Sequence, residues 1–162
     1  MRIGVIADTH IPEKADRIPQ KILKDFKNVD IIVHAGDLGD ISVLDELNSA
    51  CKTVKAVWGN MDPPAVRCRL PDRQIFKAGN YKIGVMHGYG PPKGLLKFLS
   101  CAFSGEKLDV IIFGHSHEAF NENIEGVLFF NPGSATDQAS AEHNSYGIIE
   151  INGGIETKII EI

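Results

Sequence analysis

Residues 3–10 read Ile3-Gly4-Val5-Ile6-Ala7-Asp8-Thr9-His10, an apolar run that stops at an acid with a histidine two places later. A short apolar run of this kind is typical of a strand buried on both faces of a sheet. Ile18 to Phe26 then places apolar residues at helical spacing, and Ile31 to Ala35 is a second buried strand. The order strand, helix, strand predicts a β-α-β unit with parallel strands.

The remaining apolar runs predict a mixed β core flanked by helices. Asp40 is placed to cap a helix over residues 43–47, and Thr53 to Val57 follows as a third strand, so the first third is expected to be doubly wound and parallel. Gln74 to Lys77 and Tyr81 to Met86 indicate a hairpin, which adds antiparallel strands. The other expected elements are a helix, Gly94 to Phe103, and four strands, Val110 to Phe113, Val127 to Phe130, Tyr146 to Ile151 and Ile155 to Ile160.

Length and composition narrow the class of protein. The 162 residues, 43% hydrophobic and 23% charged, predict one globular domain spanning 1–162. No apolar stretch is long enough for a membrane helix, and Asp8 arrives too early for a signal peptide, so a cytoplasmic protein with no membrane partner is expected. Three cysteines without a C-x-x-C pair argue against disulfides or a zinc knuckle. The net charge of −4 and the lack of a basic run argue against long nucleic acid as a partner, while a homo-oligomer stays open.

Polar residues follow five of the predicted strands at the point where each strand ends. Because the carboxyl ends of parallel strands meet at one edge of a sheet, segments distant in sequence can converge there on one pocket. The five segments are Asp8-Thr9-His10, Gly36-Asp37, Gly59-Asn60, His87-Gly88 and Gly114-His115-Ser116-His117.

The residue types in these segments fit divalent metal ions. Carboxylate, imidazole and amide ligands without thiolate suit Mn, Ni, Fe, Zn or Mg. Asp8 and His10 are one residue apart, so their side chains point the same way in an extended chain, and His115 and His117 repeat this spacing. If Asp37 offers one oxygen to each of two ions, seven residues supply eight ligands, which predicts a dinuclear site.

Each segment has an ordinary reading when it is taken alone. An Asp-x-His is more often a surface pair, and Gly-Asp or Gly-Asn usually marks a turn. The joint occurrence of all five at strand ends favours the metal site. His34, inside an apolar run, is expected to be a satisfied core histidine rather than a support beneath Asp37.

Taken in order, these residues resemble the calcineurin-like metallophosphoesterase superfamily from Asp8 to His117, with Asn131-Pro132-Gly133-Ser134 matching in the tail. The similarity is to its small bacterial and archaeal phosphodiesterases, which lack a cap domain. It implies a four-layer α/β/β/α sandwich with two mixed sheets flanked by helices. The implied ligands are Asp8, His10 and His117 for the first ion, Asn60, His87 and His115 for the second, and Asp37 as the bridge.

One position departs from the family pattern. Many members have a histidine directly after the motif asparagine, whereas this chain has Met61 followed by Asp62. A thioether cannot donate a proton, so Asp62, a metal-bound water or no group at all would act as general acid. The resemblance therefore implies a bias toward phosphodiesters, hydrolysed by a hydroxide that bridges two divalent ions, with Mn or Ni expected first.

The expected site adds residues for catalysis and for substrate binding. Arg67 could bind the second ester group of a diester and Tyr89 could stack on a base or an aromatic leaving group, although a solvated loop and core packing are the ordinary readings of these two. The expected catalytic residues are Asp37, Asn60 and His87, and the expected substrate-binding residues are Asn60, Asp62, Arg67 and Tyr89.

Three other functions share parts of this pattern. A phosphomonoesterase and a nucleotide pyrophosphohydrolase would use the same ions, and Met61 weighs against both. A non-catalytic scaffold resembling the retromer subunit of this family would keep the fold. A scaffold has no need of a complete ligand set, and all seven ligand positions are present here, which favours an enzyme.

Overall fold

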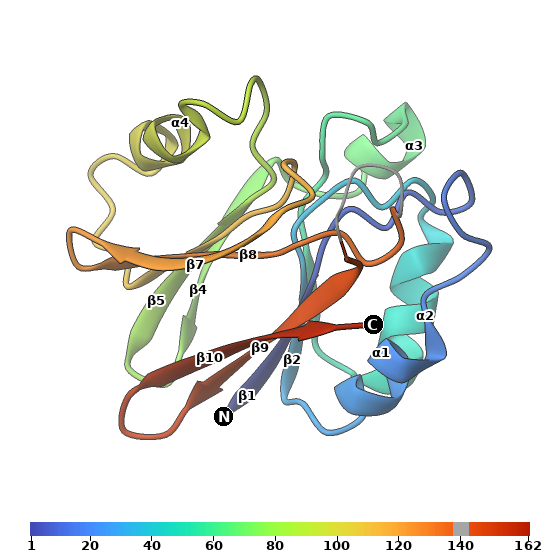
Figure 1. The fold of residues 1–162 in the computed structure, drawn as a ribbon, viewed down its shortest axis with the longest axis horizontal. Helices are drawn as coiled ribbons and strands as arrows, with labels where there is room; N and C mark the ends of the chain where they lie inside the picture. Colours follow the sequence, from blue (N-terminus) through green and yellow to red (C-terminus); the bar gives the residue numbers. More distant parts are fainter. Residues whose placement is uncertain (138–142) are drawn as a thin grey trace.

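A computed structural model describes residues 1–137 and 143–162. Two five-stranded mixed sheets lie face to face, with two helices on one outer side and one helix on the other (Figure 1). This is the four-layer α/β/β/α arrangement that the family resemblance implied. In the described part of the chain, no helix is long and apolar enough to cross a membrane.

The first sheet contains the amino-terminal β-α-β unit. Its strand order is β10-β9-β1-β2-β3, in which β1, β2 and β3 are mutually parallel and β9 and β10 are antiparallel additions. Val5 pairs with Val33 in β2 and with Gly147 in β9, so β1 lies at the centre of the sheet. The strands of this sheet are β1 (Arg2–Ile6), β2 (Ile31–His34), β3 (Val54–Ala56), β9 (Ser145–Ile151) and β10 (Ile155–Glu161).

The second sheet has the order β4-β5-β6-β8-β7. The predicted hairpin is confirmed, because β4 and β5 pair antiparallel around Gly79 and Asn80. Strands β5, β6 and β8 are parallel, and β7 closes the far edge antiparallel to β8. The strands of this sheet are β4 (Arg73–Ala78), β5 (Tyr81–Met86), β6 (Val110–Ile112), β7 (Ala119–Ile124) and β8 (Val127–Pro132).

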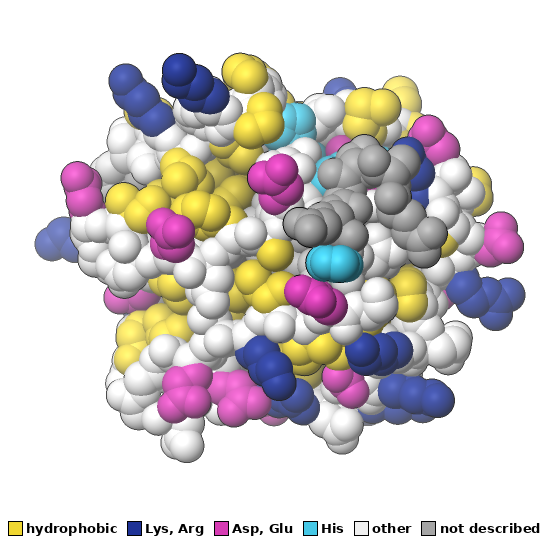
Figure 2. All heavy atoms as spheres, in the orientation of Figure 1, with side chains coloured by type: hydrophobic (Ala, Val, Ile, Leu, Met, Phe, Trp, Pro, Cys, Tyr) yellow, Lys and Arg dark blue, Asp and Glu magenta, His cyan; other side chains and the backbone are white. Residues whose placement is uncertain are grey.

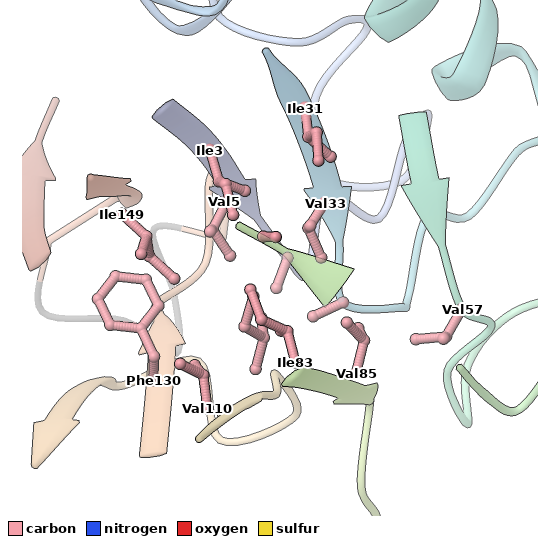
Figure 3. Packing of buried hydrophobic residues seen from close by; sticks show 14 residues of the cluster. Ile3, Val5, Ile31, Val33, Val57, Ile83, Val85, Val110, Phe130 and Ile149 are labelled. Atoms are coloured by element: carbon pink, nitrogen blue, oxygen red, sulfur yellow. The ribbon is translucent and has the colours of Figure 1, made fainter. Parts of the chain in front are cut away.

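Three hydrophobic layers hold the sandwich together. Between the sheets, Val5 and Val33 of the first sheet pack against Val85 and Phe130 of the second (Figure 3). The outer face of the first sheet is covered by two helices, and the outer face of the second sheet by one helix. The helices are α1 (Gln20–Phe26), α2 (Ser42–Ala50), α3 (Pro64–Arg67) and α4 (Leu95–Ala102).

The structure corrects four expectations about the elements. The first third is parallel but not doubly wound: α1 and α2 cover the same face, because the other face of the first sheet packs on the second sheet. Strand β7 was not predicted, and the loop expected around Arg67 contains the short helix α3. The N-cap of α2 is Ile41 rather than the expected Asp40, although Asp40 Oδ1 accepts the backbone N–H of Ser42 at 2.8 Å.

The topology places one end of the sandwich in position for a site. Strands β1, β2 and β3 run parallel in one sheet, as do β5 and β6 in the other. The five polar segments follow the carboxyl ends of these five strands. Loops from both sheets therefore meet at a single edge, as expected for an α/β fold.

Candidate metal centre

Two carboxylates lie among three imidazoles at this edge. Asp37 Oδ2 is 3.1 Å from His87 Nε2 and 3.8 Å from His10 Nε2. Asp8 Oδ1 is 3.4 Å from His117 Nε2 and 3.9 Å from the Nε2 atoms of His10 and His87. Ligand atoms within 4.8 Å of one another form two groups that share one carboxylate: Asp8, His10 and His117, and Asp8, Asp37 and His87.

The two oxygens of Asp37, the predicted bridging ligand, have different partners. Oδ1 accepts the backbone N–H of Met61 at 2.7 Å, whereas Oδ2 faces the rings of both His10 and His87. Oδ2 is therefore the oxygen of Asp37 that points into the cluster.

The backbone is held in an unusual conformation where the ligands stand. Within the described residues, six non-glycine residues have a positive φ, and five of them are predicted ligands; the sixth, Glu125, lies in a turn. Left-handed backbone is costly for residues with a side chain and collects at functional sites. The five are Asp8 (52°), His10 (40°), Asp37 (55°), His115 (74°) and His117 (59°).

Two glycines of the ligand segments are required by close approach. A Cβ at Gly59 would lie 2.2 Å from Asp37 Oδ1, and a Cβ at Gly114 would lie 2.8 Å from Asp8 Oδ2. Neither position has a positive φ, so space rather than backbone conformation demands glycine. These glycines let the two carboxylates lie against neighbouring strand ends.

The far nitrogen of three imidazoles is held by an acceptor. His87 Nδ1 lies 2.8 Å from the carbonyl of Ala35, and His115 Nε2 lies 2.7 Å from the carbonyl of Gly90. His117 Nδ1 lies 2.9 Å from a carboxylate oxygen of Asp137. The two carbonyl contacts place a proton on the far nitrogens of His87 and His115 and leave the other nitrogen of each ring free to bind an ion. The contact of His117 with Asp137 is a close charge contact that lacks hydrogen-bond geometry.

The charged groups of the cluster shift one another's pKa values. Burial lowers the pKa of His87, but Asp37 and Asp8 outweigh burial and raise it to about 9. Burial raises the pKa of Asp37, yet the adjacent His87 prevails and lowers it below its usual value. The pKa of His117 is raised, chiefly by Asp8. Without an ion, a proton on His87 balances the two carboxylates.

The residues fit a bound metal ion. His87 Nε2 is fully buried and makes no hydrogen bond within the described residues, although it faces two carboxylates. A buried polar atom without a partner is costly, and a cation between it and the carboxylates would satisfy both. The donors are carboxylate and imidazole without thiolate, as borderline and hard divalent ions prefer.

Two predicted ligands lie outside the two groups described above. Asn60 is exposed on the loop after β3, and its backbone carbonyl accepts a hydrogen bond from the Arg67 guanidinium. His115 is half-buried, and its ring centroid is 5.4 Å from that of His87. The backbone N–H of His115 also points at both carboxylate oxygens of Asp8, at 3.2 and 3.1 Å. The His115 ring therefore flanks the His87 side of the cluster.

The position of Asp62 differs from the substrate-contacting one that was expected. Its carboxylate is buried, and its oxygens accept the N–H groups of Gly39 and Gly59 at 2.8 Å each. Burial raises the pKa of this carboxyl. Asp62 ties the loop after β2 to the loop after β3, so the geometry does not present it as a general acid.

Arg67 is the last residue of α3, and Tyr89 lies in the loop between β5 and α4. Arg67 Nε donates to the Asp62 carbonyl at 2.7 Å, and its guanidinium lies over the Trp58 ring at 5.0 Å. Tyr89 is 59% exposed, with its ring edge-on to Phe98 at 4.5 Å between centroids. Figure 2 shows histidine side chains beside hydrophobic ones near the top of the molecule, between the ends occupied by α3 and α4 in Figure 1.

Residues 131–137 contact the loops that carry the ligands, a supporting role that sequence reasoning did not predict. Asn131 Nδ2 donates to the Gly114 carbonyl at 2.9 Å, and the Ser134 hydroxyl donates to the Asp8 carbonyl at 2.8 Å. The resemblance included Asn131 to Ser134, but it assigned them no contact. Asp137, beyond that motif, carried no signal in the sequence.

His34 is the satisfied core histidine that was expected. Its Nδ1 accepts the Gly36 N–H at 3.2 Å, which leaves its Nε2–H to donate to the Thr9 hydroxyl at 3.0 Å. Burial is the main cause that lowers the pKa of His34 to about 3, so the ring is neutral. It also links the loops that carry His10 and Asp37.

The fold and the ligand cluster together define a metallohydrolase domain. Residues 1–154 match the model of the calcineurin-like phosphoesterase superfamily domain, and the chain belongs to that superfamily.

Three relatives illustrate the range of the family. A probable metallophosphoesterase of Methanocaldococcus jannaschii is 40% identical over 137 residues, which cover 84% of this chain and 69% of that protein. A phosphodiesterase of the same organism is 29% identical over 150 residues, covering 82% and 83% of the two chains. The crystal structure of wild-type Vps29 from Entamoeba histolytica complexed with Zn²⁺ is 26% identical, has a TM-score of 0.76 and matches 99% of each chain.

The raised pKa of His87 predicts that metal affinity depends on pH. Below about pH 9 the metal-free protein holds a proton on His87 that a bound ion must displace. The apparent affinity for Mn²⁺ is therefore expected to rise with pH and to level off above about 9, by about tenfold per pH unit for one displaced proton. Competition with a chelator of known pH dependence measures this. An affinity that stays constant between pH 6.5 and 9 contradicts the assignment.

Proposed function

We propose that this chain hydrolyses small phosphodiesters with two divalent metal ions. Mn²⁺ or Ni²⁺ is expected first, with Fe, Zn or Mg as alternatives. In this proposal the chain is a single-domain enzyme of the cytoplasm. The observation that carries the proposal is the pair of overlapping ligand groups, with Asp8 common to both. Divalent ions in such a site neutralise phosphate oxygens and lower the pKa of water enough to supply a nucleophile near neutral pH.

The protein side chains would divide the work at the centre. Asp8, His10 and His117 would hold the first ion, and Asp37 Oδ2 would face both ion positions. The second ion would be held by three further residues, His87, His115 and Asn60. In this arrangement Asp37, Asn60 and His87 would act as the catalytic residues.

Among the described residues, the two that directly follow Asn60 offer no proton donor for the leaving group. Met61 is 62% exposed, and Asp62 is occupied by backbone N–H groups. Ester oxygens that leave without protonation are those of good leaving groups. This supports hydrolysis of diesters with such groups over phosphomonoesters and nucleotide anhydrides.

Two exposed apolar side chains flank the proposed substrate site. Met61 follows Asn60, and Tyr89 lies two residues after His87. In the proposal, the organic group of the ester contacts the open face of the Tyr89 ring. Arg67, whose Nε and one terminal nitrogen bind loop carbonyls, would attract the second ester group by its charge.

Introducing a proton donor at position 61 tests this account. Wild-type protein is expected to hydrolyse bis-p-nitrophenyl phosphate much faster than diphenyl phosphate, because phenol is the poorer leaving group. Met61→His is expected to reduce that difference, since a positioned general acid contributes about 10²-fold or more. The measurement is the ratio of kcat/KM for the two diesters, with Met61→Leu as the matched control. An unchanged ratio in Met61→His contradicts the account of the leaving group.

A non-catalytic scaffold is the second candidate. The similarity to Vps29 favours it, since that structure matches 99% of each chain. A scaffold predicts ion binding without turnover of any phosphodiester, so the same assays distinguish the two functions.

A further inference from the structure

The imidazoles of the site are supported by acceptors of different charge. His87 and His115 each face a neutral backbone carbonyl, of Ala35 and of Gly90. His117 instead faces the carboxylate of Asp137, with 2.9 Å between Nδ1 and Oδ2. A carboxylate behind a metal-binding imidazole makes it a more basic ligand and fixes its tautomer.

Asp137 is buried and makes further contacts in this position. Its side chain is 2% exposed, and its Oδ1 lies 3.3 Å from the Lys14 ammonium. Its backbone N–H donates to the Ser134 hydroxyl at 3.0 Å, and that hydroxyl donates to the Asp8 carbonyl at 2.8 Å. The carboxylate is thus buried, charge-paired and connected to the loop that carries two other ligands of the proposed first ion.

From these contacts we propose that Asp137 is a positioning residue that makes the two ion positions unequal, so that the ion held by Asp8, His10 and His117 binds first and more tightly. This inference rests on the two-ion site of the proposed function. The Lys14 ammonium lies 3.3 Å from Oδ1 of Asp137, and Oδ2 is the oxygen that faces the His117 ring.

Calorimetric titration of chelator-treated protein with Zn²⁺ tests the inequality. Wild-type protein is expected to bind two ions in two resolved steps. Asp137→Asn keeps an acceptor oxygen but removes the charge, and Asp137→Ala removes both. Each is expected to lower the affinity of the tight step by about 10- to 100-fold while the weak step stays unchanged. Asp25→Asn, which changes a carboxylate bonded to Tyr146 away from the site, is the control and should leave both steps as they are.

A spectroscopic signature separates positioning from general structural support. In the Zn²⁺-loaded protein, the His117 Nδ1–H should give a strongly downfield proton resonance, and Asp137→Ala should abolish it. The proposal is overturned if Asp137→Ala leaves the tight step and this resonance unchanged, or if both variants weaken the two steps equally. If wild-type protein binds only one ion, the two-ion premise is wrong. Normal two-step binding without turnover of a diester contradicts the proposed function and leaves this inference standing.

Discussion

Asp37→Asn is expected to abolish binding of two ions and to lower phosphodiester turnover by about 10³-fold or more. Asp37 Oδ2 faces His10 at 3.8 Å and His87 at 3.1 Å, and an amide in its place carries no charge to share between two cations. The stabilisation that a metal ion gives to a phosphoryl transition state is worth several kcal/mol, which corresponds to this loss. The measurement pairs metal content per chain with turnover of bis-p-nitrophenyl phosphate.

The control for this variant is another hydrogen-bonded carboxylate, away from the site. Asp109 Oδ2 accepts the Lys82 N–H at 2.7 Å, so Asp109→Asn changes a bonded carboxylate without touching a ligand. It should keep both ions and full turnover. Full metal loading and normal turnover in Asp37→Asn would refute the assignment of the shared ligand.

Gly59→Ala is expected to damage both the site and the fold. The added Cβ would lie 2.2 Å from Asp37 Oδ1 and 2.5 Å from the Asp37 backbone nitrogen, so the loop after β2 or the loop after β3 must shift. Overpacking of this kind costs about 1–3 kcal/mol of the free energy of unfolding. A displacement near 1 Å at a catalytic centre lowers turnover by about 10²-fold. Urea unfolding and diester turnover measure the two effects.

Gly154→Ala is the matched control. No atom lies within 4 Å of a Cβ built at Gly154, and its φ is not positive, so alanine fits there without strain. Its free energy of unfolding and its turnover should stay close to those of the wild type. If Gly59→Ala behaves like Gly154→Ala, the close approach between Gly59 and Asp37 is not a requirement of the site.

Much of the fold could be predicted from hydrophobic pattern because its central strands are buried on both faces. Residues 31–34 of β2 are all buried, and such runs stand out in a sequence. Strand β7 was missed because it is an edge strand of mostly exposed residues, including Asn121, Glu122 and Asn123, which give no apolar signal. The side of the sheet that α1 and α2 cover was also mistaken, because it depends on where the second sheet packs.

The residues of the candidate site could likewise be predicted where a strand positions them, and not where contacts distant in sequence do. Ligands that directly follow a strand, such as Asp8 and His87, could be predicted because the strand determines where they lie. Asp137 could not, because its contact with His117 depends on the path of a segment far along the chain. Asp62 was misplaced for a related reason: its two partners, Gly39 and Gly59, come from different loops that only the folded chain brings together.

Turnover of bis-p-nitrophenyl phosphate by chelator-treated protein, measured as Mn²⁺ is added in equivalents per chain, tests the two-ion mechanism most directly. The account predicts little turnover up to one equivalent, a rise between one and two, and a plateau at two. Two ions bound with no turnover of any phosphodiester, or full turnover at one equivalent, would contradict it.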